Sequence, residues 1–207
     1  MPGIREFEVR NAGAADLAGA SAALAAAFAD DPAWRWVLPS GAQRDERQAR
    51  LERFFDTELA TVTEHRNEVW VSGEGAAAAV WAPPGHWQIP LATALRTAPA
   101  MARVFGARLP WAARHQLRAE SLHPRRPPHW YLHYLGAEPL HQGRGLGSAL
   151  MWPVLELCDR EGIPAYLEAS TERNRALYER NGFEVVGTFR MPGGGPLQRR
   201  MWRKPRA

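Results

Sequence analysis

The sequence predicts one α/β domain spanning residues 1–207, and three observations support this fold class. First, 207 residues with 45% hydrophobic and 23% charged side chains suffice for a single buried core. Second, segments in which apolar and polar residues alternate, as in strands, are interspersed with segments in which apolar residues recur every three or four positions, as in amphipathic helices. Third, a glycine-rich loop at residues 142–148 joins a strand-like segment to a helical one.

The first third of the chain predicts a short strand, two helices and a β-hairpin. Residues 7–10 alternate like a half-buried strand, and residues 14–29 and 43–64 carry helical apolar spacing. The run Asp30-Asp31-Pro32 ends the first helix. The hairpin is expected at residues 69–71 and 76–81, because Gly73-Glu74-Gly75 between them permits a tight turn.

The middle of the chain predicts a helical insertion at about 86–128. Helical spacing runs from residue 90 to residue 122 but is interrupted at Pro99 and Pro110, which predicts two or three short helices. Residues 123–128 are expected to be an extended connector, because each proline fixes φ and disfavours helix in the residue before it.

The last third predicts strands at 130–137 and 165–169 on either side of a helix at 145–160. A short helix follows, on which Asn174 and Tyr178 share one face because they are four residues apart. Two final strands are expected near 184–189 and 197–203.

Composition narrows the class of protein. No apolar run approaches the roughly 18 residues of a membrane span. The first residues lack the apolar core of a signal peptide, and the single Cys158 cannot form an internal disulfide, so a cytoplasmic location is expected. The net charge of +4 comes from scattered arginines, which indicates a solvated surface and not a nucleic-acid face. No histidine or cysteine spacing predicts a metal site.

The glycine loop predicts an anion site, because glycines let a backbone approach a ligand and the first amides of the following helix are free to donate. One alternative is a dinucleotide-binding unit, in which Gly143, Gly145 and Ser148 form the loop and Glu168 binds the ribose. Against it, too little chain follows residue 143 to complete the repeated strand–helix units of that fold.

Two motifs resemble the GNAT (Gcn5-related N-acetyltransferase) superfamily. Gln142-Gly143-Arg144-Gly145-Leu146-Gly147 matches its Q/R-x-x-G-x-G/A loop, and Asn174-x-x-x-Tyr178 followed by Gly182-Phe183 matches its second motif. Residues 135–150, 164–170, 178–183 and 201–205 are most similar to the branch that contains puromycin N-acetyltransferase. The resemblance is strong from about residue 130 to the end and patchy before it.

This resemblance implies a GNAT fold: a mixed central β-sheet, flanked by helices, whose middle strands, 130–137 and 165–169, splay apart and admit acetyl-CoA. The residues that it implies in cofactor binding are Leu135, Gly136, Ala137, Gln142, Gly143, Arg144, Gly145, Leu146, Gly147, Ser148, Asn174 and Tyr178. Acetyl-CoA would be the acetyl donor, its pyrophosphate on the amides of the loop, and no metal is implied.

The implied reaction is attack of a primary amine on the thioester. Tyr178 matches the family's tyrosine that protonates the departing CoA sulfur. The base is left open between His133, whose ordinary pKa suits proton transfer near neutrality, and Glu168, which ends the facing strand. By strand alternation, His133 is expected to point to the same side as Tyr131 and Leu135. The expected acceptor-side residues are Asp30, Asp31, Trp34 and Trp36, because carboxylates and aromatic faces attract an ammonium group.

Three alternatives follow from these observations. The favoured one is an acetyl-CoA-dependent N-acetyltransferase that acts on a small-molecule amine through a ternary complex, as a monomer or homodimer. The second is an acyl-CoA-binding or sensing module without turnover, and the third is a dinucleotide-binding oxidoreductase. The sequence does not identify the amine, and residues 86–129, which are expected to shape access for it, match no motif.

Overall fold

The computed structural model describes residues 7–39, 41–65, 68–72 and 75–206. Seven strands form one mixed sheet in the order β1-β2-β3-β4-β5-β7-β6, in which β4 and β5 pair in parallel and every other neighbouring pair is antiparallel. The strands are β1 (Val9–Asn11), β2 (Glu68–Ser72), β3 (Ala77–Ala82), β4 (Trp130–Ala137), β5 (Ala165–Ala169), β6 (Glu184–Arg190) and β7 (Leu197–Arg203). With one parallel pair among the described strands, the sheet differs from that of a dinucleotide-binding unit.

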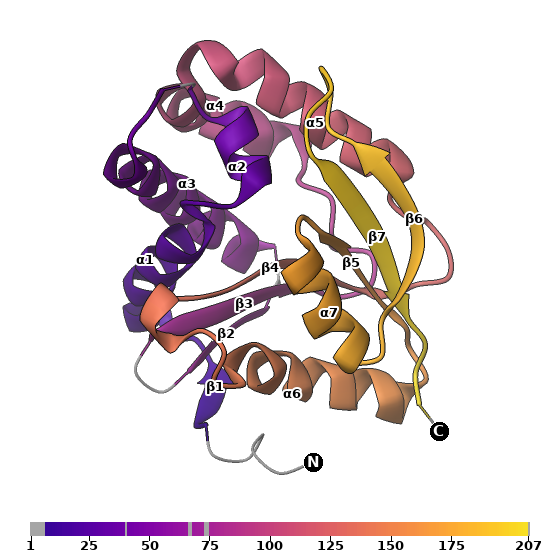
Figure 1. Ribbon diagram of the computed structural model, residues 1–207. Helices are drawn as coiled ribbons and strands as arrows, with labels where there is room; N and C mark the ends of the chain where they lie inside the picture. The colour runs from indigo at the N-terminus through magenta and orange to yellow at the C-terminus, as the bar shows by residue number, and fades with distance from the viewer. Residues whose placement is uncertain (1–6, 40, 66–67, 73–74, 207) are drawn as a thin grey trace.

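Helices cover both faces of this sheet (Figure 1). They are α1 (Leu17–Phe28), α2 (Pro32–Val37), α3 (Arg44–Glu64), α4 (Leu91–Phe105), α5 (Leu109–Leu122), α6 (Leu146–Glu161) and α7 (Glu172–Arg180), with 3-10 turns at Ala14–Asp16, Gly106–Arg108 and Pro139–His141. None of the helices in the described ranges is long and apolar enough to cross a membrane. The α/β fold expected from the sequence is confirmed.

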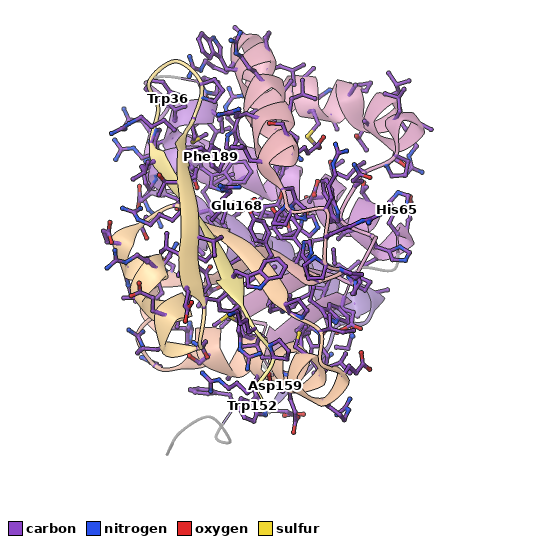
Figure 2. The ribbon with its side chains drawn as sticks, turned by 90° about the vertical axis from the view of Figure 1, so that its right-hand side faces the viewer. Trp36, His65, Trp152, Asp159, Glu168 and Phe189 are labelled. Carbon is purple, nitrogen blue, oxygen red and sulfur yellow. The ribbon has the colours of Figure 1, made fainter. Side chains whose placement is uncertain are left out.

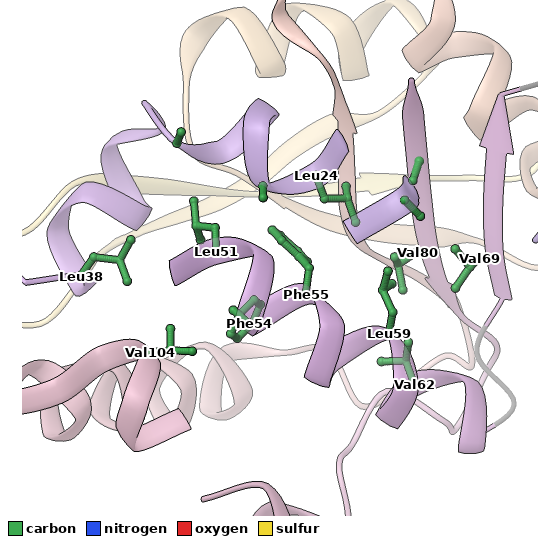
Figure 3. Packing of buried hydrophobic residues seen from close by; sticks show 14 of the residues in the cluster. Leu24, Leu38, Leu51, Phe54, Phe55, Leu59, Val62, Val69, Val80 and Val104 are labelled. Carbon is green, nitrogen blue, oxygen red and sulfur yellow. The ribbon is translucent and has the colours of Figure 1, made fainter. Parts of the chain in front are cut away.

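Two buried clusters hold the layers together. On one face, α1 and α3 pack on β2 and β3 through side chains such as Leu24, Phe55 and Val80 (Figure 3). On the other face, α6 packs on β3, β4 and β5 through Leu150 and Val154. Helices α3 and α6 each bury the apolar stripe that their spacing predicts, as amphipathic helices do.

The middle of the sheet is split. β4 pairs with β5 only along Trp130–Leu132, opposite Ala165–Leu167, whereas β4 itself continues to Ala137 and β5 to Ala169. Beyond Leu132 the two central strands therefore part, as the resemblance implies. Backbone groups on the inner sides of the parted strands lack the partner strand that a continuous sheet would supply.

A β-bulge in β4 changes which side chains face the gap. Val80 of β3 lies opposite Tyr134 and Trp81 lies opposite Leu132, so His133 is the extra residue. Tyr131, His133 and Tyr134 consequently face the α3 side, whereas Leu135 joins the cluster on the α6 side. The expectation that Leu135 shares a side with His133 is wrong, because the bulge shifts the alternation by one residue.

The predicted elements match most, but not all, of those observed. Pro99 does not interrupt the chain, because it lies inside α4, and Pro110 occupies the first turn of α5, where its missing N–H is not needed. The region therefore forms two helices. The sequence reading did not include α2, which Asp31 caps and Pro32 begins. Of the expected hairpin turn, Gly73 and Glu74 lie outside the described residues.

Candidate active site

The glycine loop ends in the first turn of α6, beside the gap between β4 and β5. Gly143 and Gly145 have φ of 79° and 96°, in the left-handed region that favours glycine. Gly145 is the N-cap of α6 and supplies no capping side chain. Among the described residues, no acceptor bonds the amides of residues 143–148, so these donors and the helix dipole point toward the cleft.

A cleft of about 580 Å³ lies over this loop, and we call it the loop cleft. It brings together most of the residues expected to bind a cofactor: Leu135, Gly136, Ala137, Gln142, Gly143, Gly145, Leu146, Gly147, Ser148, Asn174 and Tyr178. The expected Arg144 is exposed and does not line the cleft. The Gln142 side chain donates to the carbonyl of Ala137 at 3.0 Å, and the Ser148 hydroxyl accepts from Asn181 at 3.0 Å.

A second cavity, of about 470 Å³, lies on the α3 side of β4, and we call it the inner cavity. Its walls come from α3, from one face each of α4 and α5, and from β4 and β5. The two spaces share five lining residues, Phe28, Asp31, Leu135, Asn174 and Tyr178. A molecule in one space can therefore meet a molecule in the other at these side chains.

Glu168 lines the inner cavity from β5 and lies near the centre of the molecule (Figure 2). Its carboxylate accepts a hydrogen bond from the Tyr131 hydroxyl at 2.7 Å. Burial raises the pKa of Glu168, an effect that this hydrogen bond partly offsets. Tyr166 is also near enough to lower that pKa slightly, although its hydroxyl makes no hydrogen bond of good geometry within the described residues.

His133 also lines the inner cavity, but it is a weaker base than the sequence suggests. Its Nε2 atom is buried without a partner among the described residues. Burial lowers the pKa of His133 to about 3, so its imidazole is neutral at pH 7. The bulge thus places His133 at the cavity while its surroundings disfavour the charged form.

A hydrogen-bonded chain links the two spaces at their junction. Asp31 caps α2 by accepting from the amide of Ala33 at 2.8 Å, and it also accepts from the Ser170 hydroxyl at 2.5 Å. Asn174 donates to that same hydroxyl at 3.5 Å. Burial, and next the negative charge of Asp31, raise the pKa of Tyr178, so its hydroxyl stays protonated.

Glu58 is a buried carboxyl that the sequence reading did not select. It projects from α3 into the inner cavity and is only 7% exposed. Burial raises the pKa of Glu58 to about 7, with the nearby Tyr134 hydroxyl opposing the shift. A signal existed, since Glu58 follows Leu51 by seven residues and precedes Val62 by four, which places it within the apolar stripe of α3.

The four expected acceptor-side residues divide into two groups. Asp31 and Trp34 line the inner cavity, and the Trp34 ring packs against Phe54 with centroids 4.7 Å apart. Asp30 borders the loop cleft, where it is 60% exposed and pairs with Arg44 and Arg47. Trp36 lines neither space, since its indole N–H donates to the carbonyl of Pro192 at 3.1 Å.

His123 lines the inner cavity, and His129 contacts it from outside the lining. His123 stacks on Trp87 with ring centroids 3.8 Å apart and meets His129 at 3.0 Å between their Nε2 atoms. Burial lowers the pKa of His123 to about 3, so the pair is neutral at pH 7. Across the described ranges, no three His, Cys, Asp or Glu side chains are grouped as a metal site requires.

A split mixed sheet, with an open glycine loop at the split, defines the class of this protein as acetyltransferase-like, and comparisons support that class. Residues 105–183 match the model of the acetyltransferase (GNAT) family. An uncharacterized N-acetyltransferase of Schizosaccharomyces pombe is 31% identical over 180 residues, which are 82% of this chain and 71% of that protein. The chain belongs to the GNAT family and is an N-acetyltransferase.

Solved structures agree with the fold. The chain is similar to a structure described as histone acetyltransferase HPA2 and related acetyltransferase from Corynebacterium glutamicum, with 26% identity, a TM-score of 0.73 and 97% of each chain covered. It shares its fold with a phosphinothricin acetyltransferase of Sinorhizobium meliloti solved with AcCoA, at 17% identity and a TM-score of 0.54, covering 96% of this chain and 88% of that one. The GNAT fold predicted from the two motifs is confirmed.

Proposed function

We propose that this enzyme transfers the acetyl group of acetyl-CoA to the primary amine of a small molecule, by direct attack within a ternary complex. The observation that carries the proposal is the junction of the two spaces. Unbonded amides of the glycine loop face one space, buried carboxylates face the other, and Tyr178 lines both. The AcCoA complex of the Sinorhizobium meliloti protein supports the choice of donor.

In this proposal acetyl-CoA occupies the loop cleft. Its pyrophosphate accepts from the amides of residues 143–148, where the N-terminus of α6 favours an anion. Its pantetheine extends along the parted strand β4. There the backbone groups of Leu135, Gly136 and Ala137 have no neighbouring strand, so they can form hydrogen bonds with the amides of the pantetheine. Asn174 completes the contacts at the junction, and the exposed Arg144 adds a charge-assisted contact from the rim.

The reaction then proceeds at the junction. The amine, once neutral, attacks the thioester carbon, a C–N bond forms, and the carbonyl oxygen becomes an oxyanion bonded by a backbone N–H near Ala137. Collapse of this intermediate breaks the C–S bond, and the departing thiolate takes the proton of the Tyr178 hydroxyl. The nitrogen loses its surplus proton to give the amide, and a proton from solvent restores the Tyr178 hydroxyl. A tyrosine whose pKa is raised by burial suits this role, because it arrives at the transition state protonated.

Glu168 is our proposed base, acting directly or through one water. Its half-buried carboxyl has a raised pKa, which lies closer to the pKa of the ammonium group that must lose a proton. His133 is the second candidate, and its lowered pKa of about 3 makes it the weaker one. We further propose that residues 86–128 form an insertion that walls the acceptor side, and that the closest branch is the one containing puromycin N-acetyltransferase.

The test is release of CoA thiol from acetyl-CoA in the presence of a panel of primary amines. We expect Tyr178→Phe to slow release by about 10- to 100-fold with little change in acetyl-CoA affinity, because only the proton donor is lost. Trp152→Phe is the control, since Trp152 is an exposed aromatic residue that lines neither space.

Two results would contradict the proposal. If acetyl-CoA neither binds nor raises the melting temperature, the loop cleft has been misinterpreted. If acetyl-CoA binds but no amine releases thiol, the chain is the binding or sensing module that the sequence left open.

A further inference from the structure

The inner cavity carries an unbalanced charge. The chain has 26 Lys and Arg residues against 22 Asp and Glu, yet none of the described residues that line this cavity is Lys or Arg. Four carboxyl groups line it: Asp31, Glu58, Glu120 and Glu168. A cavity lined by carboxyl groups with no basic side chain favours a cation and repels an anion.

Two of the four carboxyl groups form neither an ion pair nor a hydrogen bond with a basic side chain among the described residues. Asp31 already accepts from the amide of Ala33 and from Ser170, and Glu120 accepts from Gln116 at 2.9 Å. Glu58 is buried and Glu168 is half-buried, and neither forms an ion pair among the described residues. They approach each other from α3 and β5, and the negative charges of both act on the intervening Tyr134.

Glu168 has one basic neighbour outside the cavity. Arg200 lies opposite it on β7, but the Arg200 guanidinium donates to the carbonyl of Leu122 at 3.0 Å and forms no ion pair with Glu168. The two carboxyl groups therefore leave room for a cation that the protein does not supply. Burying a carboxylate without a counter-ion is unfavourable, so a bound ammonium group would stabilise both.

Much of the remaining lining of the inner cavity is apolar. One face of α4 and one face of α5 point into the cavity with helical spacing, and most of their side chains there are small or apolar. These residues are Ala94, Ala98, Met101, Phe105, Leu109, Ala112, Ala113 and Ala119. A further wall is aromatic, formed by Phe28, Trp34 and Phe54, and it joins the α4 face at Phe105. An apolar group attached to the ammonium would bury its surface against both walls.

We infer that the acceptor is a compact lipophilic monoamine with no acidic group, whose ammonium is held by Glu58 and Glu168 while its apolar body lies between the aromatic wall and helices α4 and α5. This inference rests on the proposed function and narrows it to a substrate class. An α-amino acid would place its own carboxylate near the carboxyl groups of the cavity, where no basic side chain is available to pair with it. A diamine or polyamine would leave the apolar walls uncovered, and its second ammonium would have to compete for Asp31 and Glu120, which already accept hydrogen bonds within the protein.

The first experiment compares acceptors that differ in one group. 2-Phenylethylamine and phenylalanine share the same ring and amine, and only phenylalanine has a carboxylate; 1,4-diaminobutane replaces the apolar body with a second amine. We expect kcat/KM for 2-phenylethylamine, read by thiol release, to exceed that for each of the others by at least about tenfold. Equal values for 2-phenylethylamine and phenylalanine would overturn the inference.

The second experiment removes the charge of Glu58. Glu58→Gln is expected to raise the KM for 2-phenylethylamine by about tenfold while the affinity for acetyl-CoA is unchanged, and Glu58→Asp is expected to recover part of the loss. Asp56→Asn is the matched control, because it removes a carboxyl from the exposed side of the same helix. An unchanged KM in Glu58→Gln would contradict the assignment of the ammonium site.

A binding measurement keeps this test separate from the proposed function. Calorimetric titration of 2-phenylethylamine into the protein saturated with CoA requires no turnover. Binding that is lost in Glu58→Gln but kept in Asp56→Asn supports the inference even if no acetyl transfer occurs. If phenylalanine binds as tightly as 2-phenylethylamine, the inferred substrate class is contradicted even if acetyl transfer is observed.

Discussion

At the scale of single residues, Glu58 makes the stability of the fold depend on pH. Its carboxyl is buried, and its pKa of about 7 in the folded protein lies above the ordinary value of 4.5. Between these two pH values the folded state binds more protons than the unfolded state, so this group lowers the free energy of unfolding as the pH rises. The stabilising proton is fully present below pH 4.5 and lost through pH 7.

We therefore expect Glu58→Gln to be more stable than the wild type at pH 8 and close to it at pH 5. The upper limit of the gain is about 3 kcal/mol, because one unit of pKa corresponds to about 1.4 kcal/mol. Urea unfolding at both pH values measures the difference. As the control, Asp56→Asn should change the free energy of unfolding by less than about 0.5 kcal/mol at either pH. A Glu58→Gln variant that is less stable than the wild type at pH 8 would disprove the charge state argued for Glu58.

Single residues also show where prediction from sequence reaches its limit. Tyr178 and Asn174 could be placed together because four residues on one helix share a face. Leu135 could not be placed, because the bulge at His133 depends on the pairing of β4 with β3, which lies about 50 residues away in sequence. Trp36 shows the same limit, since its partner is the carbonyl of Pro192 at the far end of the chain.

At the scale of elements, the N-terminus of α6 depends on backbone shape. Gly145 caps this helix with a φ of 96°, and a Cβ there would meet only a Phe7 ring carbon at 3.6 Å. Space is therefore available, and the obstacle to another residue is the backbone conformation itself.

We expect Gly145→Ala to lower the free energy of unfolding by about 1–2 kcal/mol and to weaken acetyl-CoA binding at least tenfold, because relief of the strain moves the loop amides. Thermal unfolding and calorimetric titration of acetyl-CoA measure the two effects. Gly19→Ala is the control: Gly19 lies inside α1 with no atom within 4 Å of a Cβ, so alanine should stabilise by about 0.5–1 kcal/mol. Unchanged acetyl-CoA affinity in Gly145→Ala would argue against a role for these amides.

The elements differ in how far local sequence determines them. Helices α3 and α6 and strand β5 follow from periodicity, since their apolar stripes are long or their bounds are set by glycine and proline. Helix α2 has six residues, too few for a periodic pattern, and in the sequence only the Asp31-Pro32 cap indicates it. Helix α4 continues through Pro99 because it packs on α3, a contact that local sequence does not encode.

At the scale of the whole molecule, helix α5 is the least buried wall of the inner cavity. None of its residues is buried, whereas every residue of β3 is. Backbone hydrogen bonds near the surface open with less free energy than those of a core strand. We expect amide hydrogens of Leu109–Leu122 to exchange faster than those of Ala77–Ala82, and to slow when 2-phenylethylamine and CoA are both bound.

Hydrogen exchange read by mass spectrometry checks this prediction. Peptides from α3, which is buried on one side by the same cavity, give the internal comparison. Protection of α5 as strong as that of β3 before any ligand is added would contradict it.

Some features of the whole molecule could be predicted from the sequence, and others could not. The fold class followed from length and alternating periodicities, and the split sheet followed from the resemblance carried by two motifs. The charge imbalance of the inner cavity could not be predicted, because its carboxyl groups come from α2's cap, α3, α5 and β5, and only the fold brings these positions together.

The split between β4 and β5 also bears on association. A sheet ordinarily exposes two outer edges, but parting its central strands creates a further pair of edges inside the molecule, and unpaired strand edges can recruit extended chains. Here the interior edge is flanked by α1 and α7. The side chain of Gln142 partly caps it by donating a hydrogen bond to the carbonyl of Ala137. The same edge groups that would bind the amides of the proposed cofactor are therefore the groups that an extended chain would use, and we expect acetyl-CoA to compete with such a chain for them.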